Sequence, residues 1–173
     1  MADAWNHNNY CVPPEHVPLL TEAIEALFPW SVIVKKPTLI GYRLGDDLNH
    51  AALYLRPMGA ASTLHGLLAR AREERPELDA AFRTVETQDA DLNDHQGFRV
   101  PSVEEWERRV ALARTLAAQR PELRVMVVRV ERPGDRGALT DYLYQAWIRL
   151  GLLGPFRNTF EMQAYDPVKV PIR

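Results

Sequence analysis

The sequence has one cysteine, Cys11, among 173 residues, so an internal disulfide is impossible and a thiolate-rich metal site is excluded. Neither sign of charge predominates in the sequence. The 21 Lys and Arg residues are interspersed with 23 Asp and Glu residues, and the formal net charge is −2. This balance predicts neither a nucleic-acid partner nor an anionic membrane partner.

Long hydrophobic runs are also absent, and none approaches the roughly 20 apolar residues that a membrane-spanning helix needs. The first residues, MADAWNHNNY, contain neither the basic segment nor the apolar segment of a secretory signal. The chain has 46% hydrophobic and 25% charged residues, which is typical of a soluble globular protein. We therefore expect a cytoplasmic protein.

One pattern occurs twice in the chain. WNHNNYCVPP at residues 5–14 aligns with NDHQGFRVPS at residues 93–102, and the histidines of the two stretches, His7 and His95, are 88 positions apart. This offset is close to half the chain and too long for a solenoid repeat of roughly 20–50 residues. The sequence therefore predicts two copies of one module.

Both copies predict the same order of elements, β-α-β-β-β. Each begins with a short alternating strand, continues with an amphipathic helix, and ends with three strands rich in β-branched and aromatic residues. An S-x-x-E capping box, Ser102 to Glu105, marks the start of the second helix. The expected strands cover residues 7–12, 31–36, 38–45, 50–57, 94–100, 123–131, 140–150 and 158–166.

The segment between the copies is longer than a linker needs to be, and it predicts two helices around residues 63–74 and 77–85. We divide the chain into a first module (1–57), a helical connector (58–92) and a second module (93–173), all within one compact domain. The connector either covers an edge of the sheet or forms a dimer contact, so a homodimer is one of the assemblies left open.

The His-x-x-aromatic-x-Val-Pro strand that opens each module resembles the vicinal oxygen chelate superfamily. This superfamily includes glyoxalase I, extradiol dioxygenases, methylmalonyl-CoA epimerase and antibiotic-binding proteins of the bleomycin-resistance type. DHQGFRVPSVEEWERR resembles the start of a superfamily module and FEMQAYDP its last strand, and the resemblance extends over residues 5–57 and 93–167. It implies an α+β fold, in which the mixed sheets of two βαβββ modules form a cup around a central site with helices outside.

The resemblance also implies metal ligands on the first and last strands of the modules, here His7, His95 and Glu161, with Glu161 as the catalytic group. Imidazole and carboxylate groups suit divalent zinc, nickel, iron and manganese. Two histidines and one carboxylate leave coordination positions open for a small substrate that binds through neighbouring oxygens.

Strand alternation agrees with this assignment. On the last strand Phe160, Met162 and Ala164 form an apolar set that should face the helices, so Glu161, Gln163 and Tyr165 should face the cup.

The same argument applied to the first module leaves His50, Ala52 and Tyr54 facing inward. If Tyr54 corresponds to Tyr165, then His50 corresponds to Glu161 and is a fourth metal ligand. The other interpretation makes His50 a turn residue that begins a strand.

Four residues are expected to contact substrate: Arg99, Tyr54, Gln163 and Tyr165. Arg99 either binds an anionic substrate group or forms a salt bridge at the rim.

The resemblance implies a protein that binds a divalent cation and a small oxygen-bearing substrate, acting as a metal-dependent lyase, isomerase or extradiol-type dioxygenase. The alternative is a metal-free protein of the bleomycin-resistance type that sequesters a small molecule or antibiotic. Trp106 and Phe98 are expected to be buried between the second helix and its sheet.

Overall fold

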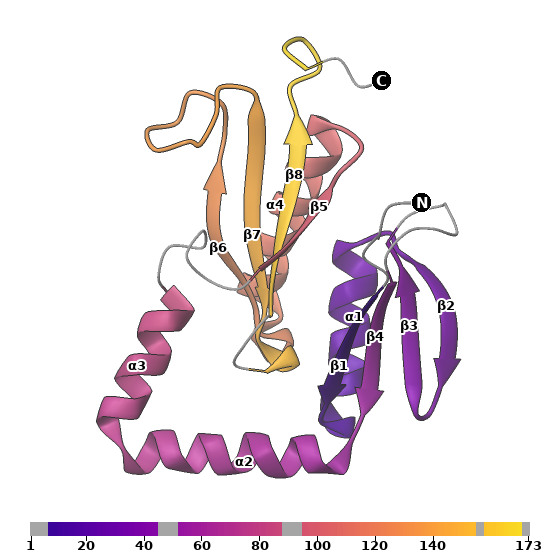
Figure 1. Ribbon diagram of the computed structural model, residues 1–173, viewed down its shortest axis with the longest axis vertical. Helices are drawn as coiled ribbons and strands as arrows, with labels where there is room; N and C mark the ends of the chain where they lie inside the picture. The colour runs from indigo at the N-terminus through magenta and orange to yellow at the C-terminus, as the bar shows by residue number, and fades with distance from the viewer. Residues whose placement is uncertain (1–6, 45–51, 88–94, 155–157, 171–173) are drawn as a thin grey trace, which may run out of the picture. The chain divides into compact units, whose positions relative to one another are not determined.

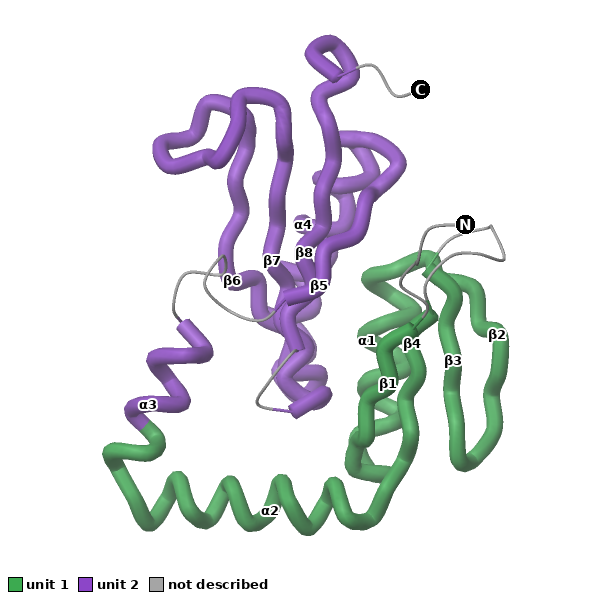
Figure 2. The backbone as a smooth tube through the Cα atoms, in the orientation of Figure 1, with its two compact units in different colours: residues 1–79 green, residues 80–173 purple. Residues whose placement is uncertain are grey.

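The computed structural model of the protein describes residues 7–44, 52–87, 95–154 and 158–170. The chain divides into two compact units, Met1–Asp79 and Ala80–Arg173, which Figure 2 colours separately. The division into two modules and a connector follows the repeat instead and remains an interpretation of the sequence. None of the described helices is both long and apolar enough to cross a bilayer.

The first unit contains the first βαβββ module. Its strands pair in the order β1-β4-β3-β2, with β1 parallel to β4 and the other pairs antiparallel. The elements are β1 (His7–Val12), the short 3-10 helix η1 (Pro14–His16), α1 (Val17–Leu27), β2 (Ser31–Lys36), β3 (Leu39–Arg43) and β4 (Ala52–Pro57).

Helix α1 covers one face of this sheet with the apolar stripe that the sequence predicts. Leu20, Ile24 and Leu27 recur at helical spacing and are completely buried, together with Ala23. The helix ends at Leu27. The next residue, Phe28, has an extended backbone because it precedes Pro29, and a proline disfavours a helical conformation of the residue before it.

The second unit repeats the architecture with the strand order β5-β8-β7-β6, β5 being parallel to β8 and the other pairs antiparallel (Figure 1). The two sheets and their helices confirm the α+β fold with two βαβββ modules. The elements of the second module are β5 (His95–Arg99), α4 (Val103–Gln119), η3 (Pro121–Leu123), β6 (Val125–Glu131), β7 (Leu143–Leu150), η4 (Gly151–Leu153) and β8 (Thr159–Tyr165).

The connector contains the two expected helices, α2 (Gly59–Glu74) and α3 (Pro76–Thr87), and both extend beyond the predicted ranges. Pro76 at the first position of α3 separates them, because proline fits the first turn of a helix but not its interior. Only Ala61 of α2 is buried, so packing contributes little to this helix.

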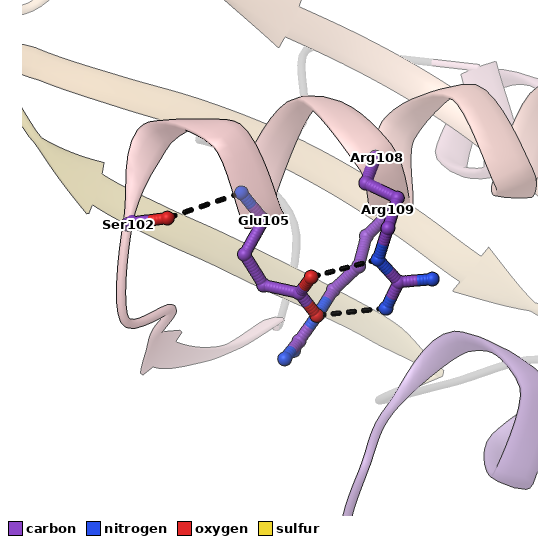
Figure 3. A network of polar contacts seen from close by, with 4 residues as sticks. All are labelled: Ser102, Glu105, Arg108 and Arg109. Carbon is purple, nitrogen blue, oxygen red and sulfur yellow. Dashed lines mark hydrogen bonds and ion pairs between the residues drawn. The ribbon is translucent and has the colours of Figure 1, made fainter.

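Helix α4 begins at the predicted cap. The hydroxyl of Ser102 accepts a hydrogen bond from the main-chain N–H of Glu105 at 3.2 Å (Figure 3). The carboxylate of Glu105 accepts from Arg108 Nε and Arg109 Nε, each at 2.7 Å. The hydrogen bonds from Arg108, with those from the buried Arg109, lower the pKa of Glu105 to about 2. One carboxylate thus neutralises a buried guanidinium at the start of the helix.

Trp106 attaches α4 to the sheet. Its side chain is fully buried, its Nε1 donates to the main-chain oxygen of Met162 at 3.0 Å, and its ring meets that of Tyr144 edge-on at 5.5 Å between centroids. Phe98 is only half-buried, contrary to expectation. It lies on β5, an edge strand, where one side has no neighbouring strand to cover it.

Replacing Trp106 by alanine should reduce the free energy of unfolding by roughly 3–5 kcal/mol, because the change removes a large buried side chain and its hydrogen bond. Chemical denaturation measures this loss. The control is Leu139→Ala, at a side chain that is 75% exposed, which should change stability by less than about 0.5 kcal/mol. A loss below about 1 kcal/mol for Trp106→Ala would show that the helix face is assigned wrongly.

Glu105→Gln should destabilise the protein at neutral pH by about 2 kcal/mol, because it removes charge-assisted hydrogen bonds to two arginines. The folded-state pKa of about 2 lies below the ordinary 4.5, so the ionised carboxylate stabilises the fold above pH 4.5. This contribution is lost as the pH falls from 4.5 towards 2.

The difference in stability between wild type and Glu105→Gln should therefore shrink over that range in denaturation curves. Glu73→Gln, at an exposed position of α2, is the matched control and should stay within about 0.5 kcal/mol at every pH. A difference that does not change with pH would contradict this account of Glu105.

Candidate functional site

The second sheet has one apolar and one polar face, as the alternation predicts. Phe160, Met162 and Ala164 of β8 are buried, and Met162 lies against Trp106 of α4. Glu161 and Gln163 point to the opposite face, because successive strand residues alternate sides. Glu161 is only 4% exposed, so this carboxylate is enclosed by its neighbours on the sheet.

The strand registers order the polar face into rows. Gly97 of β5, Glu161 of β8 and Trp147 of β7 occupy one row. The next row contains Arg99, Gln163 and Gln145, and the row on the other side contains His95, Thr159 and Arg149. Side chains in one row, and in rows two residues apart along a strand, share a face.

Three side chains hold the carboxylate of Glu161. Its Oε1 accepts hydrogen bonds from Gln145 Nε2 at 2.7 Å and Gln163 Nε2 at 2.8 Å. Its Oε2 lies 3.3 Å from Nε2 of His95. One oxygen is thus oriented by two amides, while the other faces an imidazole.

This pair fits a divalent metal ion. Nitrogen and oxygen ligands that are each ~2.1 Å from one ion, at angles between octahedral and tetrahedral, lie about 3.0–3.4 Å apart. The 3.3 Å between His95 Nε2 and Glu161 Oε2 is in this range, and the two amides orient the carboxylate as outer hydrogen bonds do in metal sites. The same distance also suits an ion pair with a protonated imidazole.

Gly97 leaves space beside this pair. A Cβ atom at this position would lie 3.2 Å from Glu161 Oε2 and 3.8 Å from Gln163 Nε2. Because most Cβ contacts are longer than the first distance, any larger residue would press on the carboxylate. Glycine therefore leaves room for Oε2 of Glu161 on the side of β5.

In the first unit, His7 begins β1 and is exposed together with Asn9 and Cys11, on the face opposite the buried Val12. The ring of His7 meets that of Tyr54 edge-on, with 5.6 Å between centroids. Tyr54 lies across Gly41 of the neighbouring strand, where an added Cβ would be only 2.6 Å from the tyrosine ring. A side chain at Gly41 would displace Tyr54.

The registers make Tyr54, rather than His50, the counterpart of Glu161. Asn9 pairs with Tyr54 on β4, as its counterpart Gly97 pairs with Glu161 on β8. The expected correspondence of Tyr54 with Tyr165 is therefore off by four residues. An even shift keeps the same side chains on the same face, so alternation could not reveal it. His50 itself lies outside the described residues, and its role as a ligand remains a prediction.

Among the residues that the structure describes, no three His, Cys, Asp or Glu side chains gather into a group that could hold a metal ion. The second unit contributes the pair His95 and Glu161, and His7 belongs to the first unit. Two of the expected ligands, His95 and Glu161, therefore lie together, and the rest of the ligand set stays a prediction.

Sequence reasoning missed two residues of the polar face, Gln145 and Glu131, and left Trp147 open between the core and the cup wall because the strand register was unknown. Gln145 pairs across the strands with Glu131, whose carboxylate binds Arg129, and the Arg129 guanidinium lies 5.6 Å from the Trp147 ring centroid. Within the described part of the chain, Glu131 Oε2 and Trp147 Nε1 are buried without a hydrogen-bond partner. Alternation along β6 and β7 would have identified these residues once their register was known.

Arg149 is a buried cation on the same face. Its Nε donates to Thr159 Oγ1 at 3.3 Å, and its Nη1 donates to the main-chain oxygen of Glu86 in α3. Burial lowers the pKa of Arg149 from its ordinary value.

No profile of a known protein family matches the chain, and no curated protein matches it. Solved structures are similar. A lactoylglutathione lyase from Agrobacterium tumefaciens is 13% identical over 94% of both chains, with a TM-score of 0.50. An integron cassette protein from V. cholerae is 14% identical over 95% of this chain and 97% of its own, with a TM-score of 0.49.

A glyoxalase/bleomycin resistance protein/dioxygenase from Nocardioides is 10% identical over all of this chain and 90% of its own, with a TM-score of 0.48. The likeness to the lyase concerns the fold alone. The chain is an α+β protein built from two βαβββ modules. Its fold is similar to that of the lactoylglutathione lyase.

Gly97→Ala should reduce the free energy of unfolding by about 1 kcal/mol, because the new methyl group presses on the buried carboxylate of Glu161. In a Glu161→Ala background the same change should cost less than about 0.5 kcal/mol, since the opposing group is gone. Denaturation of the four proteins in this cycle measures the coupling. Gly66→Ala, which meets nothing within 4 Å, is the control. Equal costs in both backgrounds would contradict the contact.

Proposed function

We propose that His95 and Glu161 bind a divalent cation and that the chain uses it on a small oxygen-bearing substrate, as a metal-dependent lyase, isomerase or extradiol-type dioxygenase. The observation that carries this proposal is the arrangement around Glu161. Its Oε2 and His95 Nε2 are separated as two ligands of one ion are, while amides from Gln145 and Gln163 hold its other oxygen.

The ion would supply a Lewis acid that polarises an oxygen of the substrate. The protein's own residues would orient the ligands and the substrate. Gln145 and Gln163 keep Oε1 occupied, so Oε2 is the oxygen left to face the metal and substrate. Gly97 leaves room beside this oxygen, and Glu161 is proposed as the catalytic group on the basis of the resemblance. Zinc, nickel, iron and manganese all accept these donors.

His7 is proposed as the third ligand, on the basis of the resemblance of the two modules to superfamily modules. His50, two residues before β4 in the sequence, is kept as a candidate fourth ligand, although the register makes Tyr54 the counterpart of Glu161. Two histidines and one carboxylate suffice for a metal with open positions. Because Tyr54 stands where the second module has Glu161, the first module offers a phenol there instead of a second carboxylate.

The position of Tyr54 favours a second candidate, a metal-free protein that sequesters a small molecule. An aromatic ring at the place of a carboxylate removes a strong ligand and adds a flat apolar surface, as a site for an aromatic ligand requires. Metal content separates the two candidates directly.

The test is elemental analysis of protein purified without chelator or affinity tag, then loaded with zinc, nickel, iron(II) or manganese. His95→Ala and Glu161→Gln should each bind less than about a tenth of the metal that wild type binds, because each removes a ligand. His65→Ala, at a helical histidine of α2, is the control and should retain it.

His7→Ala and His50→Ala extend the test, since each should change the absorption spectrum of a cobalt-substituted sample if it removes a ligand. Full metal content in both His95→Ala and Glu161→Gln would contradict the proposed site. A wild-type protein that binds none of the four ions would favour the metal-free candidate.

A further inference from the structure

Three arginines lie on the polar face of the second sheet, and they differ in what they bind. Arg129 pairs with Glu131, and Arg149 is buried and donates to Thr159 and to the main-chain oxygen of Glu86. Arg99 is exposed and has neither a hydrogen bond nor an ion pair with any residue in the described ranges. Its donors are therefore available to a ligand.

An aromatic platform holds this guanidinium in place. The Cζ atom of Arg99 lies 4.3 Å from the ring centroid of Tyr165. The ring of Tyr142 stacks with that of Tyr165, with 15° between the planes and 6.2 Å between centroids. A guanidinium over a ring face keeps its N–H groups, which match a carboxylate in a bidentate geometry.

Arg99 is also close to His95 and Glu161, the two proposed metal ligands. It pairs in register with Gln163, whose amide binds Oε1 of Glu161. The rows of Arg99 and Glu161 are two residues apart, which is about 6–7 Å along a strand. Between His95 and Arg99 on the same face of β5 stands Gly97, which has no side chain. A ligand lying over Gly97 can therefore reach both Glu161 and Arg99.

We propose that Arg99 is the anion-binding residue of this site and restricts its substrates to small organic acids. Such an acid carries two neighbouring oxygens at one end and a carboxylate two or three carbons away. The oxygens approach the ion at His95 and Glu161, and the carboxylate binds Arg99. For the chelating end of the substrate the inference rests on the proposed function. For the carboxylate end it rests on the position of Arg99 over the ring of Tyr165.

The experiment compares two probes of equal length on the zinc-loaded or manganese-loaded protein. 2-Oxoglutarate has the chelating 2-oxo acid and a distal carboxylate, whereas 2-oxopentanoate ends in a methyl group. Titration calorimetry should show that wild type binds 2-oxoglutarate about tenfold more tightly or better, as expected for charge-assisted hydrogen bonds.

Arg99→Met should abolish this preference while the bound metal stays at the wild-type level, and Arg99→Lys should restore part of it. Arg136→Met, at an exposed position in the turn between β6 and β7, is the control and should keep the preference. Equal affinity for the two probes in wild type, a preference that survives in Arg99→Met, or loss of metal from Arg99→Met would each overturn the inference.

The outcome also separates the inference from the proposed function. If the wild-type protein binds no metal but still prefers 2-oxoglutarate in a manner that depends on Arg99, then the metal proposal is wrong and the anion-binding role of Arg99 stands. If metal binds and Arg99 makes no difference, the metal proposal stands and the anion-binding role is wrong.

Discussion

The hydrogen bond from the indole of Trp106 to the main-chain oxygen of Met162 connects helix α4 to the central strand β8. It lies inside the core, and both side chains are fully buried. Because the faces of a strand alternate, a Met162 side chain held against the helix places Glu161 and Gln163 on the other face. The polar chemistry of the second sheet therefore depends on how a tryptophan on its apolar side is packed.

A carboxylate that is 4% exposed is costly to keep ionised unless its environment compensates for the lost water. The protein compensates Glu161 mainly with neutral donors, two glutamine amides on one oxygen, and with an imidazole near the other. Amides orient a carboxylate without adding a fixed charge. The two glutamines thus fix the orientation of the Glu161 carboxylate, and its Oε2 faces the imidazole of His95.

Alternation predicted which side chains of β8 face the helix and which face away, because a period of two is a property of any strand. It could not predict the pairing of β1 with β4, since a shift of four residues leaves every side chain on its face. The assignment of Tyr54 depends on this register. Arg109 is a similar case: its spacing from Glu105 predicts contact, but its burial depends on tertiary packing, which the spacing does not encode.

The two modules fill equivalent rows in opposite ways. In the first, Asn9, Tyr54 and Gly41 stand side by side, and the glycine on the inner strand makes room for the phenol ring. In the second module the glycine of this row is on the edge strand β5. Gly97 now stands where the first module has Asn9, while Trp147 occupies the inner position.

Small residues decide where a sheet face is open, because a side chain of ordinary size covers its neighbours. The space at the inner Gly41 is occupied by the ring of Tyr54, whereas the space at the edge Gly97 lies beside Oε2 of Glu161. The same repeat thus produces a row with an aromatic ring over a glycine in one unit and a row with a carboxylate beside a glycine in the other. This asymmetry places the buried carboxylate of Glu161, and Arg99 on the same face of the sheet, in the second module.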